Sequence, residues 1–316
     1  MSNFITCTTD RLTDQQKKGI CDLFFQVFHK EKSFEHFNRQ FFGTCRRHSY
    51  HCIYEKDHKI LANYCIVPYE YTVNGAKQIF GLSVDTIVSP EAGLGPFAVA
   101  DMAALTEGLA KEDGCQLLYG FPNDNAFQYN IDILQRYPMG FLEFYILPLA
   151  LGKIKRVPRY LNFLRYFSIA LVKICRLGAS SVKITYPVEK VDSPDFRKNR
   201  YDRRHHFIRF KGGEAVYTLF EESFGTIAYI VDIAPLTGKN FYTAFLQVAF
   251  EVKNNAGLIA YPSGRLPFGS ILRIPHRFLP RKVQMIVAGM GENKTPASIY
   301  CSMSNWKINL SDFDVR

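Results

Sequence analysis

The stretch DTIVSPEAGLGPFA (residues 85–98) decides how the rest of the sequence is interpreted. It begins with residues typical of a strand, turns at a Ser-Pro pair, and then carries Gly93 and Gly95 with one residue between them. Pro96 suits the first position of a helix, where a missing N–H costs nothing. Amides in a glycine turn at a helix N-terminus bind phosphates because they carry partial positive charge. The stretch therefore predicts a strand, a phosphate-binding loop and a helix, with a plain connecting loop as the alternative.

Two better-known phosphate loops fit this stretch less well. GLGPFA satisfies the dinucleotide fingerprint G-x-G-x-x-A, but that loop needs parallel strands and an acidic residue about 20 residues further on. Here the strands before the loop are joined by hairpins, and the next strand, CQLLYGF (residues 115–121), ends in Pro-Asn. A Walker loop needs Gly-Lys-Ser/Thr, which does not follow. The loop is therefore expected to hold a different phosphate-bearing ligand.

The residues before the loop predict two helices and three antiparallel strands. Thr13 and Gln16 form a capping box ahead of an apolar face with helical period, and Ser33 caps a second helix. Three β-rich segments follow, and Asn74-Gly75 is a hairpin turn between the last two. The predicted strands are residues 50–56, 59–73 and 77–88.

The residues after the loop first complete this arrangement, and the residues from 213 onward then repeat it. After the loop we expect a helix ended by Gly114, a strand, a helix over residues 123–137 and one strand over residues 140–151. Further on, residues 213–235 are predicted to form a hairpin, residues 240–257 a helix and residues 258–264 a strand. The predicted fold class is α/β (α+β), with two tandem domains that each contain a mixed, mostly antiparallel sheet flanked by helices.

Composition limits the class of protein. The chain has 316 residues, 47% apolar and 22% charged, which is enough for two ordinary domains. The formal net charge of +10 predicts an anionic partner: a phosphorylated cofactor, a nucleotide-linked substrate, a membrane surface or a nucleic acid. The eight cysteines form no C-x-x-C pair, which indicates buried thiols in a reducing compartment.

No segment is expected to cross a membrane or to direct secretion. The most lipophilic stretch, residues 160–177, is interrupted by Arg165 and Lys173 and is shorter than the ~20 apolar residues a spanning helix needs. The N-terminal residues contain no apolar core of signal-peptide length. A cytoplasmic protein is the expectation.

The order of antiparallel strands, glycine loop, helix and strand resembles the GNAT superfamily of acyl-CoA-dependent N-acyltransferases. DTIVSPEAGLGPF (residues 85–97) is similar to the family's strand and pyrophosphate loop, and LLYGFPNDNAF (residues 117–127) to its next strand and Pro-Asn turn. The chain looks most like bacterial members with a second, degenerate GNAT-like half, often associated with sugar or cell-surface polysaccharide modification. The resemblance implies a GNAT-like acyl-CoA-binding domain over residues 1–152, a linking helix and linker over 153–195, and a degenerate GNAT-like domain over 196–316.

The resemblance also implies a ligand and its contacts. Acyl-CoA, in the first place acetyl-CoA, would be the co-substrate, and no metal is implied. The strand before the loop would offer its backbone to the pantetheine arm, the loop amides would hold the diphosphate, and the Pro-Asn turn would lie near the thioester. The residues in these roles would be Ile87, Val88, Gly93, Leu94, Gly95, Phe97 and Asn123.

Acyl transfer to an amine needs a base for the amine and an acid for the leaving thiolate. Asp85, on the strand before the loop, is the candidate base, with a purely structural carboxylate as the alternative. Tyr129 is the candidate acid, with a half-buried helix tyrosine as the alternative. The family's acidic tyrosine usually follows the turn asparagine by seven residues, and Asn130 occupies that position here.

Two departures from the family pattern keep a second function open. The family's loop carries Arg or Gln ahead of the glycines, where this chain has Glu91 and Ala92, and the tyrosine is displaced by one residue. These departures favour a non-catalytic GNAT-fold binding module with a decayed cofactor loop. The retained glycine pair, the Pro-Asn turn and the tandem plan favour an enzyme.

The densest basic run, residues 196–211, predicts the acceptor site. Arg200 and Arg203 are the candidate residues for binding an anionic amine acceptor, such as a nucleotide-linked sugar, because guanidinium groups bind oxyanions in pairs. A solvated surface and contact with a membrane surface are the alternatives, and nucleic acid is not expected. His205 and His206 lack a partner at metal-ligand spacing, so no metal site is expected.

Overall fold

The computed structural model describes residues 4–95, 97–279, 282–290 and 295–313, which form two compact units. The first unit comprises Met1–Gly140, Pro187–Arg200 and Val283–Asn305, and the second comprises Phe141–Tyr186, Tyr201–Lys282 and Trp306–Arg316. Pro96, which the sequence places at the first helical position, lies outside the described residues.

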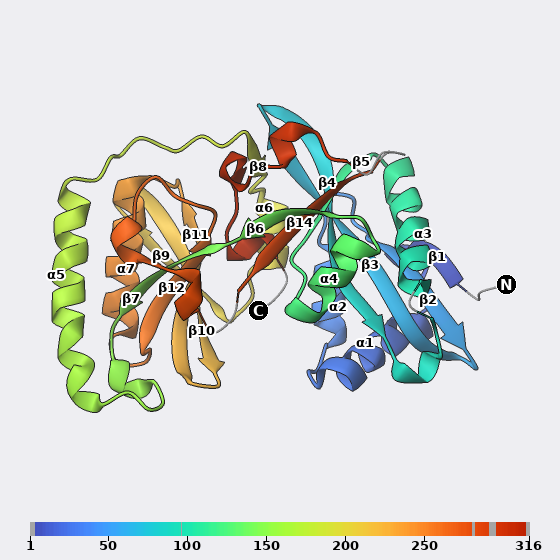
Figure 1. Ribbon diagram of the computed structural model, residues 1–316, viewed down its shortest axis with the longest axis horizontal. Coiled ribbons are helices and arrows are strands. Elements are labelled where there is room, and N and C mark those ends of the chain that lie inside the picture. The colour runs from blue at the N-terminus through green and yellow to red at the C-terminus, as the bar shows by residue number, and fades with distance from the viewer. Residues whose placement is uncertain (1–3, 96, 280–281, 291–294, 314–316) are drawn as a thin grey trace. The chain divides into compact units, whose positions relative to one another are not determined.

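The first unit contains a mixed sheet whose main strand order is β1-β2-β3-β4-β5-β14-β6, shown in Figure 1. Only the pairing of β4 with β5 is parallel among the pairings described along this path. The strands are β1 (Phe4–Thr8), β2 (Tyr50–Lys56), β3 (Lys59–Val73), β4 (Ala76–Val88), β5 (Cys115–Gly120), β6 (Tyr137–Phe141), β8 (Val188–Lys190) and β14 (Gln284–Gly289). The helices are α1 (Asp14–Phe28), α2 (Phe34–Phe42), α3 (Ala98–Glu112), α4 (Asp124–Asp132) and α6 (Pro194–Arg200).

Local sequence explains where these elements begin and turn. Thr13 and Gln16 make the predicted capping box on α1, and the Ser33 hydroxyl accepts the His36 amide at the start of α2. Asn74 and Gly75 adopt φ values of 49° and 86°, as a tight hairpin between β3 and β4 requires. The predicted helices and the three antiparallel strands before the loop are confirmed.

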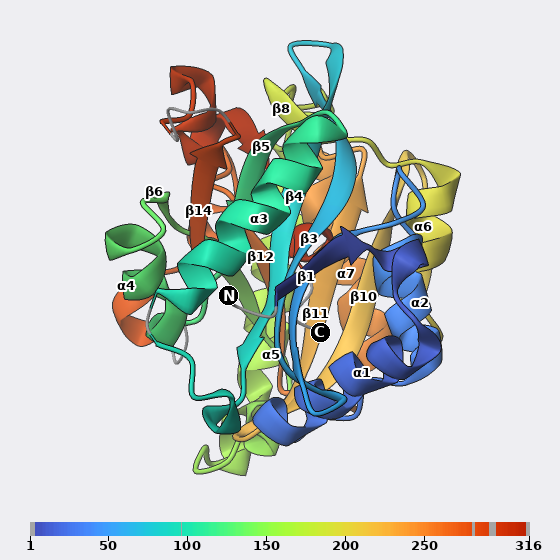
Figure 2. The ribbon, with the colours of Figure 1, turned by 90° about the vertical axis from the view of Figure 1, so that its right-hand side faces the viewer.

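Helices cover both faces of the first sheet. Tyr50, Cys52, Ala62 and Tyr64 pack in one core cluster with α3, which lies across the strands in Figure 2. Residues that alternate with these point to the other face, where the ring of His51 stacks on residues of α2. The α3 face and the α1–α2 face are therefore distinct environments.

The second unit contains its own mixed sheet, in the order β13-β7-β12-β11-β10-β9. Its core is formed between this sheet and two helices, because α7 packs on the strands while α5 packs on α7 and β7. The strands of this sheet are β7 (Glu143–Pro148), β9 (His205–Phe210), β10 (Gly213–Glu222), β11 (Gly225–Ala234), β12 (Leu258–Ser263) and β13 (Arg273–Ile274), and the two-residue strand β15 (Trp306–Lys307) is not part of it. The helices are α5 (Leu164–Leu177) and α7 (Gly238–Val252).

The same order of elements recurs in the two sheets. In the first, antiparallel β2, β3 and β4 lead through a loop and α3 to β5, which pairs parallel to β4. In the second, antiparallel β9, β10 and β11 lead through α7 to β12, which pairs parallel to β11. The predicted fold class, two mostly antiparallel mixed sheets flanked by helices, is confirmed; the predicted domain limits stay a prediction.

Each sheet completes itself with a strand from a distant part of the chain. β14 pairs antiparallel to β5 in the first sheet, and β7 pairs antiparallel to β12 in the second. The single strand predicted over residues 140–151 is therefore wrong: the chain breaks at the buried Leu142, with β6 in the first sheet and β7 in the second. The helix predicted over residues 123–137 is also too long, because α4 ends at Asp132 and Gln135 turns the chain with a φ of 54°.

A buried ion pair joins α3 to the segment after α4. The guanidinium of Arg136 contacts the carboxylate of Glu107 on α3 and donates to the hydroxyl of Tyr64 on β3, which also accepts from Ser83 on β4. Arg136 and Glu107 are both buried, so each charge depends on the other for compensation. The pair holds α3 against the sheet near the end of the β4–β5 pairing.

We expect Glu107→Ala to destabilise the first unit by about 3–5 kcal/mol, because it leaves the buried guanidinium of Arg136 without a counter-charge. The matched control is Lys59→Ala, which breaks an exposed pair with Glu91 and should change the free energy of unfolding by less than about 1 kcal/mol. Urea-induced unfolding measures both. Equal, small effects for the two variants would show that the buried pair does not hold α3.

Candidate functional site: the β4 bulge and the glycine loop

A β-bulge sits in β4 just before the glycine loop. Asn63 pairs with Ile87 and Cys65 pairs with Val84, so two residues of β4, Asp85 and Thr86, lie opposite one residue of β3. Asp85 takes a φ of 49°, a left-handed conformation that non-glycine residues seldom adopt. A bulge bends its strand and increases its twist, so it redirects the end of β4.

The bulge coincides with the point where β4 and β5 separate. The parallel pairing runs from Ile79 and Cys115 to Ser83 and Gly120, where β5 ends. In the described pairing, residues 84–88 of β4 then pair with β3 only. Their other edge leaves backbone N–H and C=O groups for an extended ligand to pair with. Ile87 and Val88, predicted to contact pantetheine, lie in this segment.

The glycine loop presents backbone rather than side chains. After Ser89, which accepts the Glu91 amide, a 3-10 turn over Pro90–Ala92 leads to Gly93 with a φ of 62°. Gly93 and Gly95 are exposed, and a Cβ added at either would meet no atom within 4 Å, whereas Leu94 between them packs against the α3-side core. The loop is thus anchored by Leu94 and open on its glycine side, as a diphosphate cradle requires.

The N-terminus of α3 adds positive partial charge to this loop. Phe97, at the N-cap, has an exposed side chain and makes no side-chain capping bond, so the amides of the first turn are not satisfied by a side chain at that position. Ala98 donates to the carbonyl of Gly95. The arrangement fits an anionic ligand at the loop.

The acidic residue in the loop is engaged elsewhere. Glu91 forms an ion pair with Lys59, with 2.5 Å between the lysine nitrogen and the carboxylate. Lys59 opens β3, and so it draws this carboxylate toward the strand. The pair offsets the negative charge that the sequence places next to the proposed anion site.

Tyr129 and Asn123 come from α4 and its start. The Asn123 side chain caps α4 by accepting the Ala126 amide at 2.9 Å. Tyr129 is half-buried and packs with Leu94 and Ala100 against the α3-side core. Burial raises the pKa of Tyr129, opposed in part by the backbone amide of Ala100, so the phenol stays protonated at neutral pH. The structure thereby brings the candidate acid to the first turn of α3.

Asp85 lies in a different environment. Its carboxylate pairs with Lys32, and both side chains are almost completely buried. The Lys32 ammonium also donates to Gln40 at 2.7 Å and lies over the rings of Phe24 and Phe41, at 4.4 and 5.0 Å from their centroids. The carboxylate is therefore on the α1–α2 face of the sheet, whereas Tyr129 packs on the α3 face. The two predicted catalytic residues do not lie together.

A buried polar chain continues from the bulge, and sequence reasoning missed it. Asn63 donates to the carbonyl of Asp85, and its side-chain oxygen lies 3.1 Å from Nδ1 of His51. Nε2 of His51 lies 3.1 Å from the hydroxyl of Thr9. Burial lowers the pKa of His51 to about 4, so the ring is neutral at physiological pH. Neither Lys32 nor His51 belongs to a recognisable motif, because their partners are distant in the sequence.

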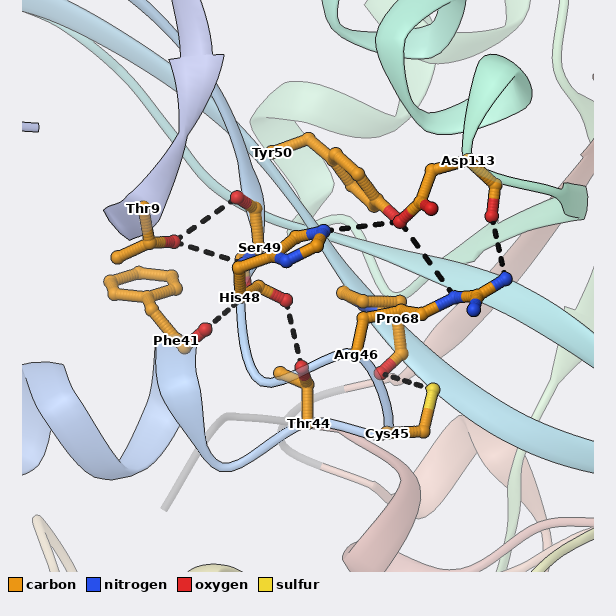
Figure 3. Close-up of polar contacts among 10 residues, drawn as sticks. All are labelled: Thr9, Phe41, Thr44, Cys45, Arg46, His48, Ser49, Tyr50, Pro68 and Asp113. Atoms are coloured by element: carbon orange, nitrogen blue, oxygen red, sulfur yellow. Dashed lines mark hydrogen bonds and ion pairs between the residues drawn. The ribbon is translucent and has the colours of Figure 1, made fainter. Parts of the chain in front are cut away.

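The far end of α3 is also held by charge, as Figure 3 shows. Asp113, the C-cap, accepts from the Tyr50 hydroxyl at 2.5 Å and contacts His48 at 3.0 Å, and its backbone carbonyl accepts from Arg46. Burial raises the pKa of Asp113, but the hydrogen bonds from Tyr50 and His48 and the nearby Arg46 outweigh it and keep the pKa below its usual value. This network fixes the axis of α3 and hence the direction of its N-terminus.

The residues predicted to bind the acceptor lie in different units. Arg200 is the last residue of α6 in the first unit, and Arg203 is exposed in the turn before β9 in the second. Between them Asp202 binds Arg204 and His205. Whether Arg200 and Arg203 serve one acceptor stays a prediction.

Across the residues described, no group of three or more His, Cys, Asp or Glu side chains could hold a metal ion. No helix in the described ranges has the length and apolarity needed to span a membrane.

Comparison with solved structures identifies the fold. A GCN5-related N-acetyltransferase from Anabaena variabilis matches with a TM-score of 0.57 and 12% identity, over 91% of this chain and 73% of that one. Saccharomyces cerevisiae N-myristoyltransferase with bound myristoyl-CoA matches at 0.52 and 10% identity, over 91% and 83%. Eis1 from Mycobacterium abscessus matches at 0.54 and 8% identity, over 94% and 76%. No protein-family model matches the sequence, and neither does any curated protein.

These likenesses span more than nine tenths of the chain. The protein has the GNAT fold, as the sequence predicted.

The buried His51 generates a pH prediction. Because its pKa is about 4 when folded and near 6.5 when unfolded, the unfolded chain binds more protons between these values. Stability is therefore complete above pH 6.5 and falls as the pH drops toward 4, by on the order of 3 kcal/mol from this residue. His51→Gln should flatten the dependence in this window, measured as the free energy of unfolding against pH. An unchanged slope in the variant would assign the acid sensitivity to other groups.

Proposed function

We propose that the protein is an acyl-CoA-dependent N-acyltransferase, with acetyl-CoA as the first candidate co-substrate. The observation that carries the proposal is the open glycine side of the loop, placed between the splayed end of β4 and the first turn of α3. Amides and a helix N-terminus aimed at one place suit a diphosphate. Solved proteins of this fold include one with bound myristoyl-CoA, which supports acyl-CoA as the ligand class.

Binding is assigned to backbone groups. The amides of Gly93, Leu94, Gly95 and Phe97 would bind the diphosphate, and the free edge of β4 at Ile87 and Val88 would pair with the amides of the pantetheine arm. Because residues 84–88 pair only with β3 in the described sheet, such pairing needs no rearrangement of the strand.

The chemistry assigned to the site is attack of a neutral amine on the thioester carbonyl carbon. The C–N bond forms, the C–S bond breaks, the amine loses a proton to a base or to water, and the leaving thiolate takes one up. Tyr129 is assigned as the proton donor, because its phenol is protonated at neutral pH and its side chain packs with Leu94 of the loop and Ala100 of the first turn of α3. Asp85, predicted from the sequence as the base, is paired with Lys32 on the α1–α2 face, so in this proposal the proton of the amine passes to water.

The acceptor is proposed to be an amine on a sugar or another anionic metabolite, bound through Arg200 and Arg203.

The reaction is proposed to take place in the cytoplasm. The eight cysteines are all free, and a reducing compartment keeps thiols in that state.

Two observations favour a second function, a GNAT-fold binding module without catalysis. The carboxylate of Asp85 is engaged by Lys32 on the α1–α2 face, and the loop carries Glu91 and Ala92 in place of the family's Arg or Gln. Such a module would bind acyl-CoA without turning it over, so binding and turnover must be measured separately.

We expect acetyl-CoA to bind the protein and raise its melting temperature, because a ligand that binds only the native state stabilises it by mass action. Gly95→Glu should weaken binding by about tenfold or more, because it places a carboxylate where the diphosphate lies. Gly108→Glu is the matched control: it adds the same charge at an exposed glycine of α3 outside the loop, where a Cβ also meets open space, so the fold and binding should stay close to wild type. Isothermal titration calorimetry measures all three proteins. Absence of acyl-CoA binding to the wild type would refute both functions.

Tyr129→Phe should lower kcat by about a hundredfold or more while leaving coenzyme affinity unchanged, because it removes the proton donor and keeps the ring packing. Tyr137→Phe, at an exposed tyrosine of β6, is the control and should leave kcat unchanged. The assay is release of free thiol with a panel of amino sugars. Tight acyl-CoA binding without any turnover across the panel would favour the binding module.

A further inference from the structure

A long basic segment, all but its last two residues in the second unit, is not used by the proposed acyl-transfer site. Residues 144–188 contain no Asp or Glu. They contain eight basic residues, and most of these side chains are exposed. These are Lys153, Lys155, Arg156, Arg159, Arg165, Lys173, Arg176 and Lys183. The segment therefore carries a formal charge of +8 over one continuous stretch, without internal compensation.

The helix in this segment, α5, exposes an apolar face. Phe163, Phe167, Ile174 and Leu177 follow one another at intervals of four, seven and three residues, which places them on one side of the helix, and Tyr166, three residues after Phe163, lies beside them. Phe167 is 68% exposed, Ile174 66% and Leu177 87%. An aromatic and aliphatic stripe of this extent is unusual on the surface of a water-soluble domain.

The opposite side of α5 already serves the core of the second unit. Ser168 and Val172 are buried, and Ile169 and Cys175 pack against the cluster formed with α7. The exposed stripe is therefore not needed to attach the helix. Figure 1 shows α5 packed alongside α7, with no described strand on its other side.

Basic side chains border the stripe. Lys173 and Arg176 are exposed on α5 itself, and neither takes part in an ion pair described in this chain. Arg165 donates to the hydroxyl of Tyr166 at 2.6 Å and lies over its ring, 4.6 Å from the centroid. Aromatic rings beside Arg and Lys are typical of segments that lie in the interface of a bilayer, where rings enter the acyl boundary and cations meet headgroup phosphates.

We propose that α5 and its flanking residues dock the protein on an anionic membrane surface, with the helix in the plane of the interface. At 14 residues the helix is about 21 Å long, too short to span a bilayer but suited to lie on it. The positive charge of the segment indicates which partner covers the exposed stripe. A second copy of this chain would place two stretches of +8 face to face, whereas a lipid surface rich in phosphatidylglycerol neutralises the charge. The proposal stands independently of the acyl-transfer function.

The test is co-sedimentation of the full chain with vesicles. We expect binding to vesicles of phosphatidylcholine with about one third phosphatidylglycerol, little binding to phosphatidylcholine alone, and weakening by salt. Phe167→Ser with Ile174→Ser should abolish binding while the melting temperature stays unchanged, since both side chains are exposed. Lys173→Gln should reduce the partition constant by about fivefold. Phe250→Ser, at a phenylalanine 53% exposed on α7, is the matched control and should bind as wild type does.

Three outcomes would overturn the proposal. The first is absence of binding to anionic vesicles by a folded wild-type chain. The second is equal loss of binding in Phe250→Ser and in the α5 variant. The third is a dimer in sedimentation velocity that dissociates in the α5 variant, which would assign the stripe to a second copy of this chain.

Discussion

The bulge in β4 is the constraint on which the rest of the site depends. One extra residue opposite Tyr64 turns the strand, ends its pairing with β5 at Ser83 and leaves a free backbone edge beyond. The left-handed conformation of Asp85 has a conformational cost, which the buried pair with Lys32 and the hydrogen bond from Asn63 offset. A carboxylate that fixes the bulge contributes to the site even without touching a substrate. This structural role is the simplest account of why it lies on the α1–α2 face.

The second requirement is that α3 point its N-terminus at the loop. Two separate charge clusters hold the helix: Arg136 with Glu107 in its middle, and Arg46, His48 and Tyr50 around Asp113 at its end. Between them these two clusters restrain rotation and tilt of α3, and with them the direction of its first-turn amides. Preorganisation of this kind raises affinity because less conformational freedom is lost on binding. The absence of a side-chain cap at Phe97 fits the same logic, since an anion bound at the loop can satisfy the first-turn amides.

The sequence predicted those features of the fold that depend on residues close together in the chain. The caps at Thr13 and Ser33 and the Asn74-Gly75 turn depend only on residues close in the sequence, and each was predicted correctly, while the phosphate-binding role of the glycine loop stays a prediction. Interactions across long separations were missed. β14 joins the first sheet beside β5 although more than 160 residues lie between them. β7 follows β6 of the first sheet after a single residue, yet it pairs with β12 in the second sheet. Lys32 lies between two helices, where nothing marks it as the partner of a residue more than 50 positions away.

The distribution of charge also separates the two basic regions by role. Residues 144–188 carry +8, and residues 196–211, with seven Lys and Arg and one Asp, carry +6. Since the whole chain has +10, everything else sums to −4. The excess is therefore confined to two segments and does not coat the molecule, which disfavours general binding to nucleic acid. In residues 196–211 Asp202 binds Arg204 and His205, so part of that charge is locally compensated. The α5 segment has no acidic residue of its own and borders an exposed apolar stripe, a combination that suits a lipid surface better than a small anion.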